Sequence, residues 1–194
     1  MPPFSEATVN IASTVATFVP GYNRFPSNDF PRIAVSDAAG TVSIVWNDAR
    51  TNPLGDILMQ SFNLGSLIAV QPTPVKLNND RTSALHFLPA VRYADSNGRL
   101  SVSWYDRRLN PSSAITDVFA ALGVDPRTTS TPSNSRVTDV SSNWLAVSSD
   151  IVPNFGDYTD NYVVMGTGKH ASNISYFAWS DGRLGDPQPF EAHH

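Results

Sequence analysis

The sequence predicts an all-β fold made of three four-stranded propeller blades, which is half of a β-propeller. Two observations support this prediction. The straight-chain helix formers are almost missing, because fifteen of the seventeen acidic residues are Asp and eleven of the thirteen basic residues are Arg. Short apolar runs of period two alternate with turns rich in Asn, Pro and Gly, and one strand-and-turn pattern occurs three times.

Length and composition limit the classes of protein to consider. With 194 residues, 41% of them hydrophobic and 15% charged, residues 1–192 are expected to form one folded domain, and His193 and His194 are interpreted as the remnant of a purification tag. Cysteine is absent, which excludes disulfides and thiol nucleophiles but leaves the compartment open, including a secreted or extracytoplasmic bacterial location. No apolar run reaches the roughly 18 residues of a membrane span. The net charge of −4, with scattered basic residues, argues against a nucleic-acid partner.

The repeated motif is Trp-x-Asp-x-Arg at the end of an apolar strand. In each copy a polar loop leads to a second Asp. We expect the Asp and Arg of each triplet to form an ion pair at the turn, with the Trp packed between neighbouring sheets. The triplets span residues 46–50, 104–108 and 179–183, and the second acidic residues are Asp56, Asp117 and Asp186.

Each repeat is expected to contain the same elements in the same order. An apolar strand and a Gly-containing hairpin turn lead to the strand that ends in the triplet, and after a loop a third strand begins at the second Asp. The fourth strands are expected at 70–77 and 135–140, and the third repeat lacks one. The predicted blades cover about residues 27–78, 85–140 and 153–192.

The order of these motifs resembles the carboxyl-terminal half of bacterial sialidase-like (BNR-repeat) six-bladed propellers. The resemblance covers about residues 7–186 and is carried by the segments 30–35, 103–111, 136–139, 155–158 and 178–183. It implies a fold and not sialidase activity. A sialidase needs a Tyr assisted by Glu, and the only glutamates here are Glu6 and Glu191.

Three blades leave a propeller ring open. An open half-ring exposes sheet edges and an apolar inner face, which natural chains avoid by pairing. Two copies related by a two-fold axis would supply the six blades that the resemblance implies, so we expect a homodimer. Residues 7–18 have the pattern of a strand without a blade, and are predicted to complete the last blade of the partner copy.

The residues that begin the innermost strands are expected at the mouth of the central channel. These positions hold Asp29, His86 and Asn154, with Asp157 nearby. Carboxylate and amide oxygens with an imidazole suit a divalent cation, so all four are predicted metal ligands for Ca²⁺ or Zn²⁺.

A metal at this mouth would polarise a carbonyl or phosphoryl oxygen and activate water. The sequence therefore predicts a metal-assisted hydrolase of esters or phosphoesters. Six-bladed lactonases and organophosphate hydrolases are similar in carrying Ca²⁺ in the channel. The predicted catalytic residues are His86, Asp157 and Tyr158, and the predicted substrate-binding residues are Tyr93, Tyr105 and Arg108.

Two other interpretations remain open. The ring could bind carbohydrate without catalysis, through Trp, Tyr and Arg side chains at its rim, or it could be purely structural. Under either interpretation, Asp29 and Asn154 would cap turns and His86 would be a hydrogen-bonded loop residue. Sensitivity to a chelator separates the hydrolase from the other two.

Overall fold

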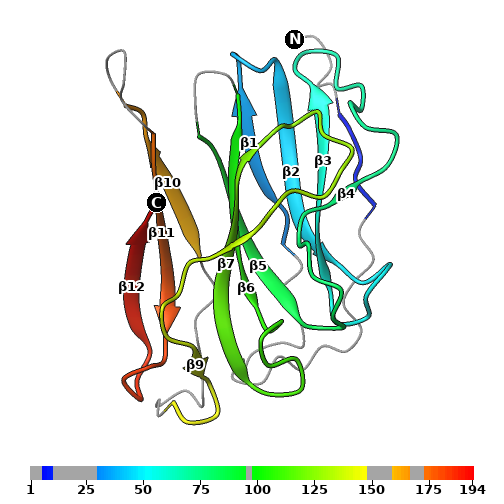
Figure 1. Cartoon of the computed structure of the whole chain (residues 1–194). Helices are drawn as coiled ribbons and strands as arrows, with labels where there is room; N and C mark the ends of the chain where they lie inside the picture. Colours follow the sequence, from blue (N-terminus) through cyan, green and yellow to red (C-terminus); the bar gives the residue numbers. More distant parts are fainter. Residues whose placement is uncertain (1–5, 11–29, 95–97, 148–158, 167–172) are drawn as a thin grey trace.

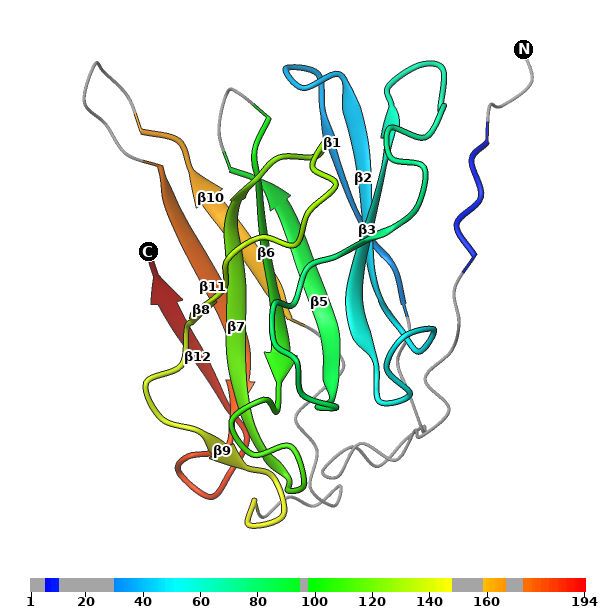
Figure 2. The same ribbon diagram turned by 45° about the vertical axis from the view of Figure 1, so that its right-hand side comes forward.

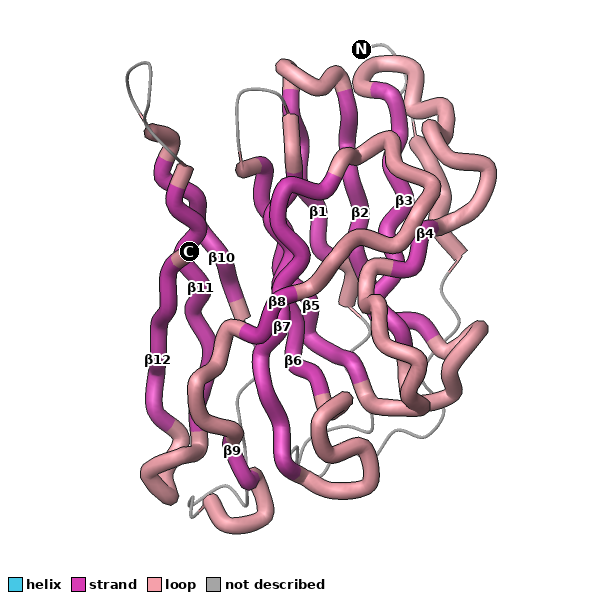
Figure 3. Tube along the Cα trace, in the orientation of Figure 1, coloured by secondary structure: helices cyan, strands magenta, loops and turns pink. Residues whose placement is uncertain are grey.

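The computed structural model describes residues 6–10, 30–94, 98–147, 159–166 and 173–194, and these contain strands, turns and loops but no helix (Figures 1 and 3). The prediction of an all-β chain is confirmed. These described residues contain no helix that is long and apolar enough to span a membrane.

The strands form three antiparallel sheets, each of which follows the order of the chain. The first sheet contains β1 (Arg32–Ser36), β2 (Thr41–Asp48), β3 (Asp56–Asn63) and β4 (Val75–Lys76). The second contains β5 (His86–Tyr93), β6 (Leu100–Asp106), β7 (Ile115–Val124) and β8 (Ser135–Arg136), and β9 (Ser142–Asn143) also pairs with β7. The third contains β10 (Asp160–Val164), β11 (Ile174–Asp181) and β12 (Gln188–His193).

A glycine turn joins the first two strands of the first sheet and meets the corresponding turn of the second sheet. Gly40 has a φ of +61° and its N–H donates to the carbonyl of Asp37 at 3.1 Å. Gly98 also has a positive φ, +73°, and a Cβ atom there would lie 2.2 Å from that of Ala39. Any larger residue at position 98 would therefore push the two turns apart.

The sheets lie next to one another in chain order, with their first strands adjoining (Figure 2). β5 contacts both β1 and β10. Trp104 belongs to the apolar core between the first and second sheets, and Trp179 to the core between the second and third. The expectation that the repeated Trp packs between sheets is confirmed for these two residues. Three adjoining meanders are consistent with part of a propeller.

The third repeat differs from the prediction. Asp48 lies opposite Asp56 and Asp106 opposite Asp117, but Asp181 lies opposite Gln188. The prediction that Asp186 starts the third strand of this repeat is therefore wrong. Register is set by pairing across the hairpin, which the spacing of acidic residues along the chain does not reveal.

The fourth strands are shorter than predicted. β4 and β8 each have two residues, although Phe62 and Ala69 form one further bridge.

His193 belongs to β12, and Ser175 exchanges backbone hydrogen bonds with His194 at 2.9 and 3.0 Å. Of the predicted closing strand 7–18, only residues 7–10 are described, and they run beside the first sheet outside any strand (Figures 1 and 2).

Candidate functional site

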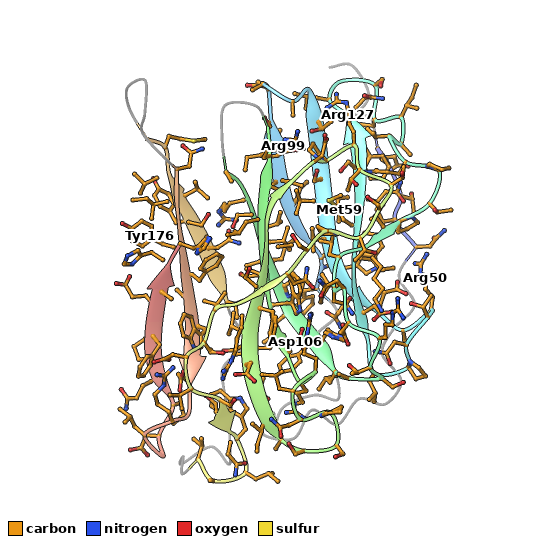
Figure 4. The ribbon with its side chains drawn as sticks, viewed as in Figure 1. Arg50, Met59, Arg99, Asp106, Arg127 and Tyr176 are labelled. Carbon is orange, nitrogen blue, oxygen red and sulfur yellow. The ribbon has the colours of Figure 1, made fainter. Side chains whose placement is uncertain are left out.

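The candidate site lies at the end of the sheets where the first strands begin and the second strands finish. The triplet residues Arg50 and Asp106 both lie toward this end in Figure 4. The antiparallel order places the start of each first strand beside the end of its second strand, as His86 beside Asp106 demonstrates. The repeated triplets are therefore brought to the same end as the residue predicted to be catalytic.

Each triplet forms the same hydrogen-bonded unit. The indole Nε1 of the Trp donates to Oδ2 of the Asp at 2.8, 2.7 and 3.0 Å in the three repeats. The backbone N–H of the Arg donates to Oδ1 at 2.9, 2.8 and 2.9 Å, and its guanidinium Nη2 to Oδ2 at 2.8, 2.7 and 2.8 Å. The predicted ion pair is confirmed in all three. Because the Asp side chains are fully buried, these donors offset a desolvation cost of several kcal/mol per ion.

The second acidic residue of the first repeat is held by its fourth strand. Asp56 lies 2.9 Å from Lys76 Nζ and also accepts hydrogen bonds from Thr51 and Asn78. Burial would raise the pKa of Asp56, but these hydrogen bonds and the charge of Lys76 outweigh it, so the pKa lies below its ordinary value. The carboxylate is therefore charged at neutral pH.

His86 is fully buried at the start of β5 between two sheets. Its Nδ1 lies 2.8 Å from the carbonyl oxygen of Gly55, and its Nε2 lies 3.1 Å from Oδ1 of Asp80 and 3.6 Å from Oδ2 of Asp106. Burial alone would lower the pKa of His86. The hydrogen bond to Asp80 and the charges of Asp106 and Asp80 outweigh burial, so the pKa lies above its ordinary value.

Both ring nitrogens of His86 face oxygen acceptors. An imidazole that donates from both nitrogens carries two protons and is positively charged. In that state it has no lone pair with which to bind a metal ion or accept a proton. Nε2 also lies 3.4 Å from Nδ2 of Asn78, an amide that donates to Asp56 and Asp80. The geometry thus favours the protonated form of His86 between Asp80 and Asp106.

Asp80 is not among the residues predicted from the sequence, although of the described carboxylates it lies nearest to His86. It lies in the loop after β4, where Thr82 and Asn78 also donate to it. Burial would raise the pKa of Asp80, but the hydrogen bond and charge of His86 hold it well below its usual range. The signal available in the sequence was its place in the polar loop 78–86, which leads to His86.

These loops connect each sheet to the triplet of the next. Nη1 of Arg108 donates to Oδ1 of Asn79 at 2.8 Å, and Nη1 of Arg183 donates to Oδ1 of Asp139 at 2.7 Å. Ser142 adds a hydrogen bond of 3.0 Å to Asp181. The loop after a fourth strand is therefore a connector between neighbouring sheets.

The three predicted substrate-binding residues also make contacts between or within sheets. The hydroxyl of Tyr93 lies 2.7 Å from Thr41 Oγ1 in the first sheet. The buried hydroxyl of Tyr105 accepts from the N–H of Ser180 and donates to its carbonyl, both at 2.9 Å, and burial raises its pKa. Arg108 is 10% exposed and pairs with Asp106. Substrate binding by these residues stays a prediction.

The predicted metal site is only partly within the described residues. Asp29, Asn154, Asp157 and Tyr158 lie outside them, and among those described no group of three or more His, Asp or Glu side chains is arranged to hold a metal ion. Of the four predicted ligands, only His86 lies within the described residues. Its Nδ1 faces the carbonyl oxygen of Gly55, and its Nε2 faces Asp80 and Asp106. Binding of Ca²⁺ or Zn²⁺ stays a prediction.

An open cleft of about 460 Å³ lies beside β3 and β4 at the same end of the first sheet. Its polar lining comes from the loop after β2, from β4 and from the loop before β5, and includes Arg50, Asn52, Lys76, Arg81 and Ser83. Arg81 and Ser83 are exposed to solvent. Its volume falls in the range of small-molecule sites, about 300 to 1,000 Å³.

No protein-family model and no curated protein matches the chain. Among solved structures the chain is similar to an N-acetylgalactosamine deacetylase from F. plautii, crystallised with blood group B trisaccharide, with a TM-score of 0.43 and 11% sequence identity. The match covers 80% of this chain and 42% of that one, so the chain spans less than half the length of the deacetylase. A likeness of this size carries no argument about function.

Proposed function

We propose that the chain is half of a sialidase-like propeller that closes with a second copy and binds carbohydrate without catalysis. The observation that carries the binding proposal is the contrast between buried and exposed polar groups at one end of the sheets. His86 and the aspartates around it are buried and engaged with one another, whereas the cleft beside β3 and β4 presents the exposed polar side chains of Arg81 and Ser83. A sugar is held by many such groups and needs no proton transfer.

Ring closure is supported by apolar side chains on the two outermost sheets. Ile33 and Val35 of β1 are 60% and 54% exposed, on the side of the strand opposite Ala34, which packs toward the second sheet. Tyr162 and Val164 of β10 are 67% and 44% exposed. Contiguous exposed apolar residues are typical of a surface that meets another surface.

The binding proposal is tested by a glycan array followed by calorimetry on each glycan that binds. We expect binding that is unchanged by EDTA and weakened at least about tenfold in Arg81→Gln, which corresponds to about 1.4 kcal/mol. Arg127→Gln is the matched control, because Arg127 is an exposed base at the opposite end of the sheets (Figure 4). Equal losses in both variants, or no binding at all, would overturn the proposal.

A metal-assisted hydrolase of esters or phosphoesters is the second candidate. It is the use that the sequence predicts for His86, and it requires the imidazole to give up the proton that its contacts with Asp80 and Asp106 favour. A site that binds Ca²⁺ or Zn²⁺ only in the folded state would raise the melting temperature, and EDTA would reverse the rise. A melting temperature that neither cation nor EDTA changes favours the binding module and rejects the hydrolase.

A further inference from the structure

The third sheet has an open edge at β12, since no described strand pairs with its outer side. Ser175 and His194 exchange both backbone hydrogen bonds, so the even-numbered residues of β12 direct their backbone N–H and C=O groups toward β11. Successive residues of a strand direct these groups to opposite sides, so the backbone groups of Pro189, Glu191 and His193 face outward. An edge of this kind is prepared to pair with another strand.

The first sheet shows what completes such an edge. Lys76 of β4 lies opposite Leu58 of β3. The next residue, Leu77, donates its backbone N–H to β3 at 2.7 Å, and the one after it, Asn78, donates its amide to Asp56 at 3.0 Å. Lys76 itself pairs with Asp56 at 2.9 Å. The completing segment therefore reads base, apolar residue, Asn.

The second sheet repeats this arrangement. Arg136 of β8 lies opposite Phe119 of β7 and pairs with Asp117 at 2.7 Å. Val137 donates its backbone N–H to β7 at 2.8 Å, and Thr138 donates its hydroxyl to Asp117 at 2.9 Å. The segment reads base, apolar residue, Thr, so its third residue is again small and polar.

Residues 8–10, Thr-Val-Asn, match the pattern at its second and third positions. Ala7 and Val9 are half-buried and alternate with exposed neighbours, as in a strand. The neutral Thr8 stands where the other segments have a base. The position of the buried acid in the third sheet is likewise neutral, Gln188. The proposed pair Thr8 and Gln188 therefore lacks both the basic and the acidic member of the ion pairs Lys76–Asp56 and Arg136–Asp117. This is expected if the two positions face each other.

Residues 6–10 already lie where the outer strand of a preceding sheet would lie. Arg108 and Arg183 each donate to the residue that follows such a segment, Asn79 and Asp139. Arg50, the equivalent arginine of the first sheet, donates from Nη2 to the backbone carbonyl oxygen of Asn10, which is the last residue of the segment and one position before the residue that the other two arginines contact. This place is at the opposite end of the row of sheets from β12 (Figure 2), so the segment and the open edge of one chain do not meet.

We propose that residues 6–10 of one copy form the fourth strand of the third sheet of a second copy. The inference rests on the proposed ring closure and specifies its contact. By analogy with the first two sheets, the strand runs antiparallel to β12 with Thr8 opposite Phe190 and Ala7 opposite Glu191. The N–H of Val9 then donates to the carbonyl oxygen of Pro189, a contact that is possible although proline has no N–H of its own. Asn10 faces Gln188. A two-fold pair makes this exchange twice.

A disulfide across the proposed contact tests it, and the absence of natural cysteine keeps the experiment clean. Ala7 and Glu191 fall on a hydrogen-bonded pair, whose Cα atoms lie about 5.5 Å apart, within the range of about 4.4 to 6.8 Å that a disulfide spans. Under mild oxidation, Ala7→Cys combined with Glu191→Cys is expected to give a covalent dimer. Mixing the two single variants is expected to give a heterodimer with one link.

The matched control shifts one cysteine by a single residue. Thr8→Cys combined with Glu191→Cys points the two thiols to opposite faces of the sheet, so we expect several-fold slower linking. Equal rates for both pairs would overturn the register and with it the proposal.

Light scattering on the unmodified chain separates this proposal from ring closure. A dimer whose cysteine pair does not link would retain ring closure but overturn the exchanged strand. A monomer without links would overturn both. A disulfide formed inside a monomer would also overturn the exchange, because the strand would then pair with its own β12.

Discussion

Buried ionic groups at the strand ends act as a connected set. Oδ2 of Asp106 accepts from the indole of Trp104 and from Arg108, and lies 3.6 Å from Nε2 of His86. His86 in turn contacts Asp80 in the loop that follows the first sheet. Removing one member would leave the others buried without compensation, which commonly costs about 3 to 5 kcal/mol. The imidazolium is therefore a stabilising contact between two sheets.

The raised pKa of His86 predicts how stability depends on pH. A folded-state pKa above the unfolded value of about 6.5 means that the folded protein holds its proton more tightly. The stabilisation is fully present below about pH 6.5 and is lost as pH rises through the folded-state pKa. We expect the free energy of unfolding, measured in urea, to fall as pH rises from 6.5.

The control for this prediction is His86→Gln. Glutamine keeps hydrogen-bonding capacity but cannot titrate, so the decline above pH 6.5 should be flattened and stability at pH 6 reduced. Asp80 has a lowered pKa, so its contribution is present above about pH 3.8 and is lost at lower pH as the folded form takes up a proton. An unchanged slope above pH 6.5 in the variant would contradict the charged state assigned to His86.

The contacts between elements repeat from one sheet to the next. Loops after β4 and β8 reach the triplet arginines of the following sheet, and tyrosine hydroxyls add contacts between strands. Tyr105 of β6 bonds both backbone groups of Ser180 in β11. Polar contacts of this type fix the relative position of sheets that apolar packing alone would allow to slide.

Tyr105→Phe removes the hydroxyl between the second and third sheets. It leaves the N–H and C=O of Ser180 without this partner, so we expect a loss of about 1 to 3 kcal/mol in the free energy of unfolding. Tyr93→Phe is the comparison. A smaller loss is expected because its closest partner is the rotatable hydroxyl of Thr41, while the hydroxyl of Ser43 and the carbonyl of Thr41 each lie at 3.2 Å. Chemical denaturation measures both. Equal stability of Tyr105→Phe and the unmodified chain would contradict the account of this contact.

The repeated motif predicted much of the local structure from sequence. Period-two runs and the scarcity of Glu and Lys indicated strands, and the structure has them with no helix among its described residues. The Asp and Arg of each triplet are close in sequence, so their ion pairs followed from local spacing. Asp56 was correctly expected to begin a strand.

Contacts between distant segments were beyond the same reasoning. The pairing of Asp181 with Gln188 instead of Asp186 depends on hairpin register. The approach of Asp80 to His86 depends on how one sheet packs on the next, which neither composition nor spacing encodes. The predicted site treated His86 as a ligand at an open channel, and the structure surrounds it with Gly55, Asp80 and Asp106.

Apolar side chains are exposed at both ends of the row of sheets. One end carries Ile33 and Val35, and the other carries Tyr162, Val164 and the edge of β12. Two copies related by a two-fold axis would cover both ends with two equivalent contacts. Because each contact would bury apolar side chains and pair an open edge, the ring would be more stable than the separated chains.

The molecular mass in solution tests this account most directly. Light scattering coupled to size exclusion, at micromolar protein, is expected to give twice the chain mass of 21.0 kDa. A mass of 21.0 kDa that does not change with concentration would contradict closure by a second copy.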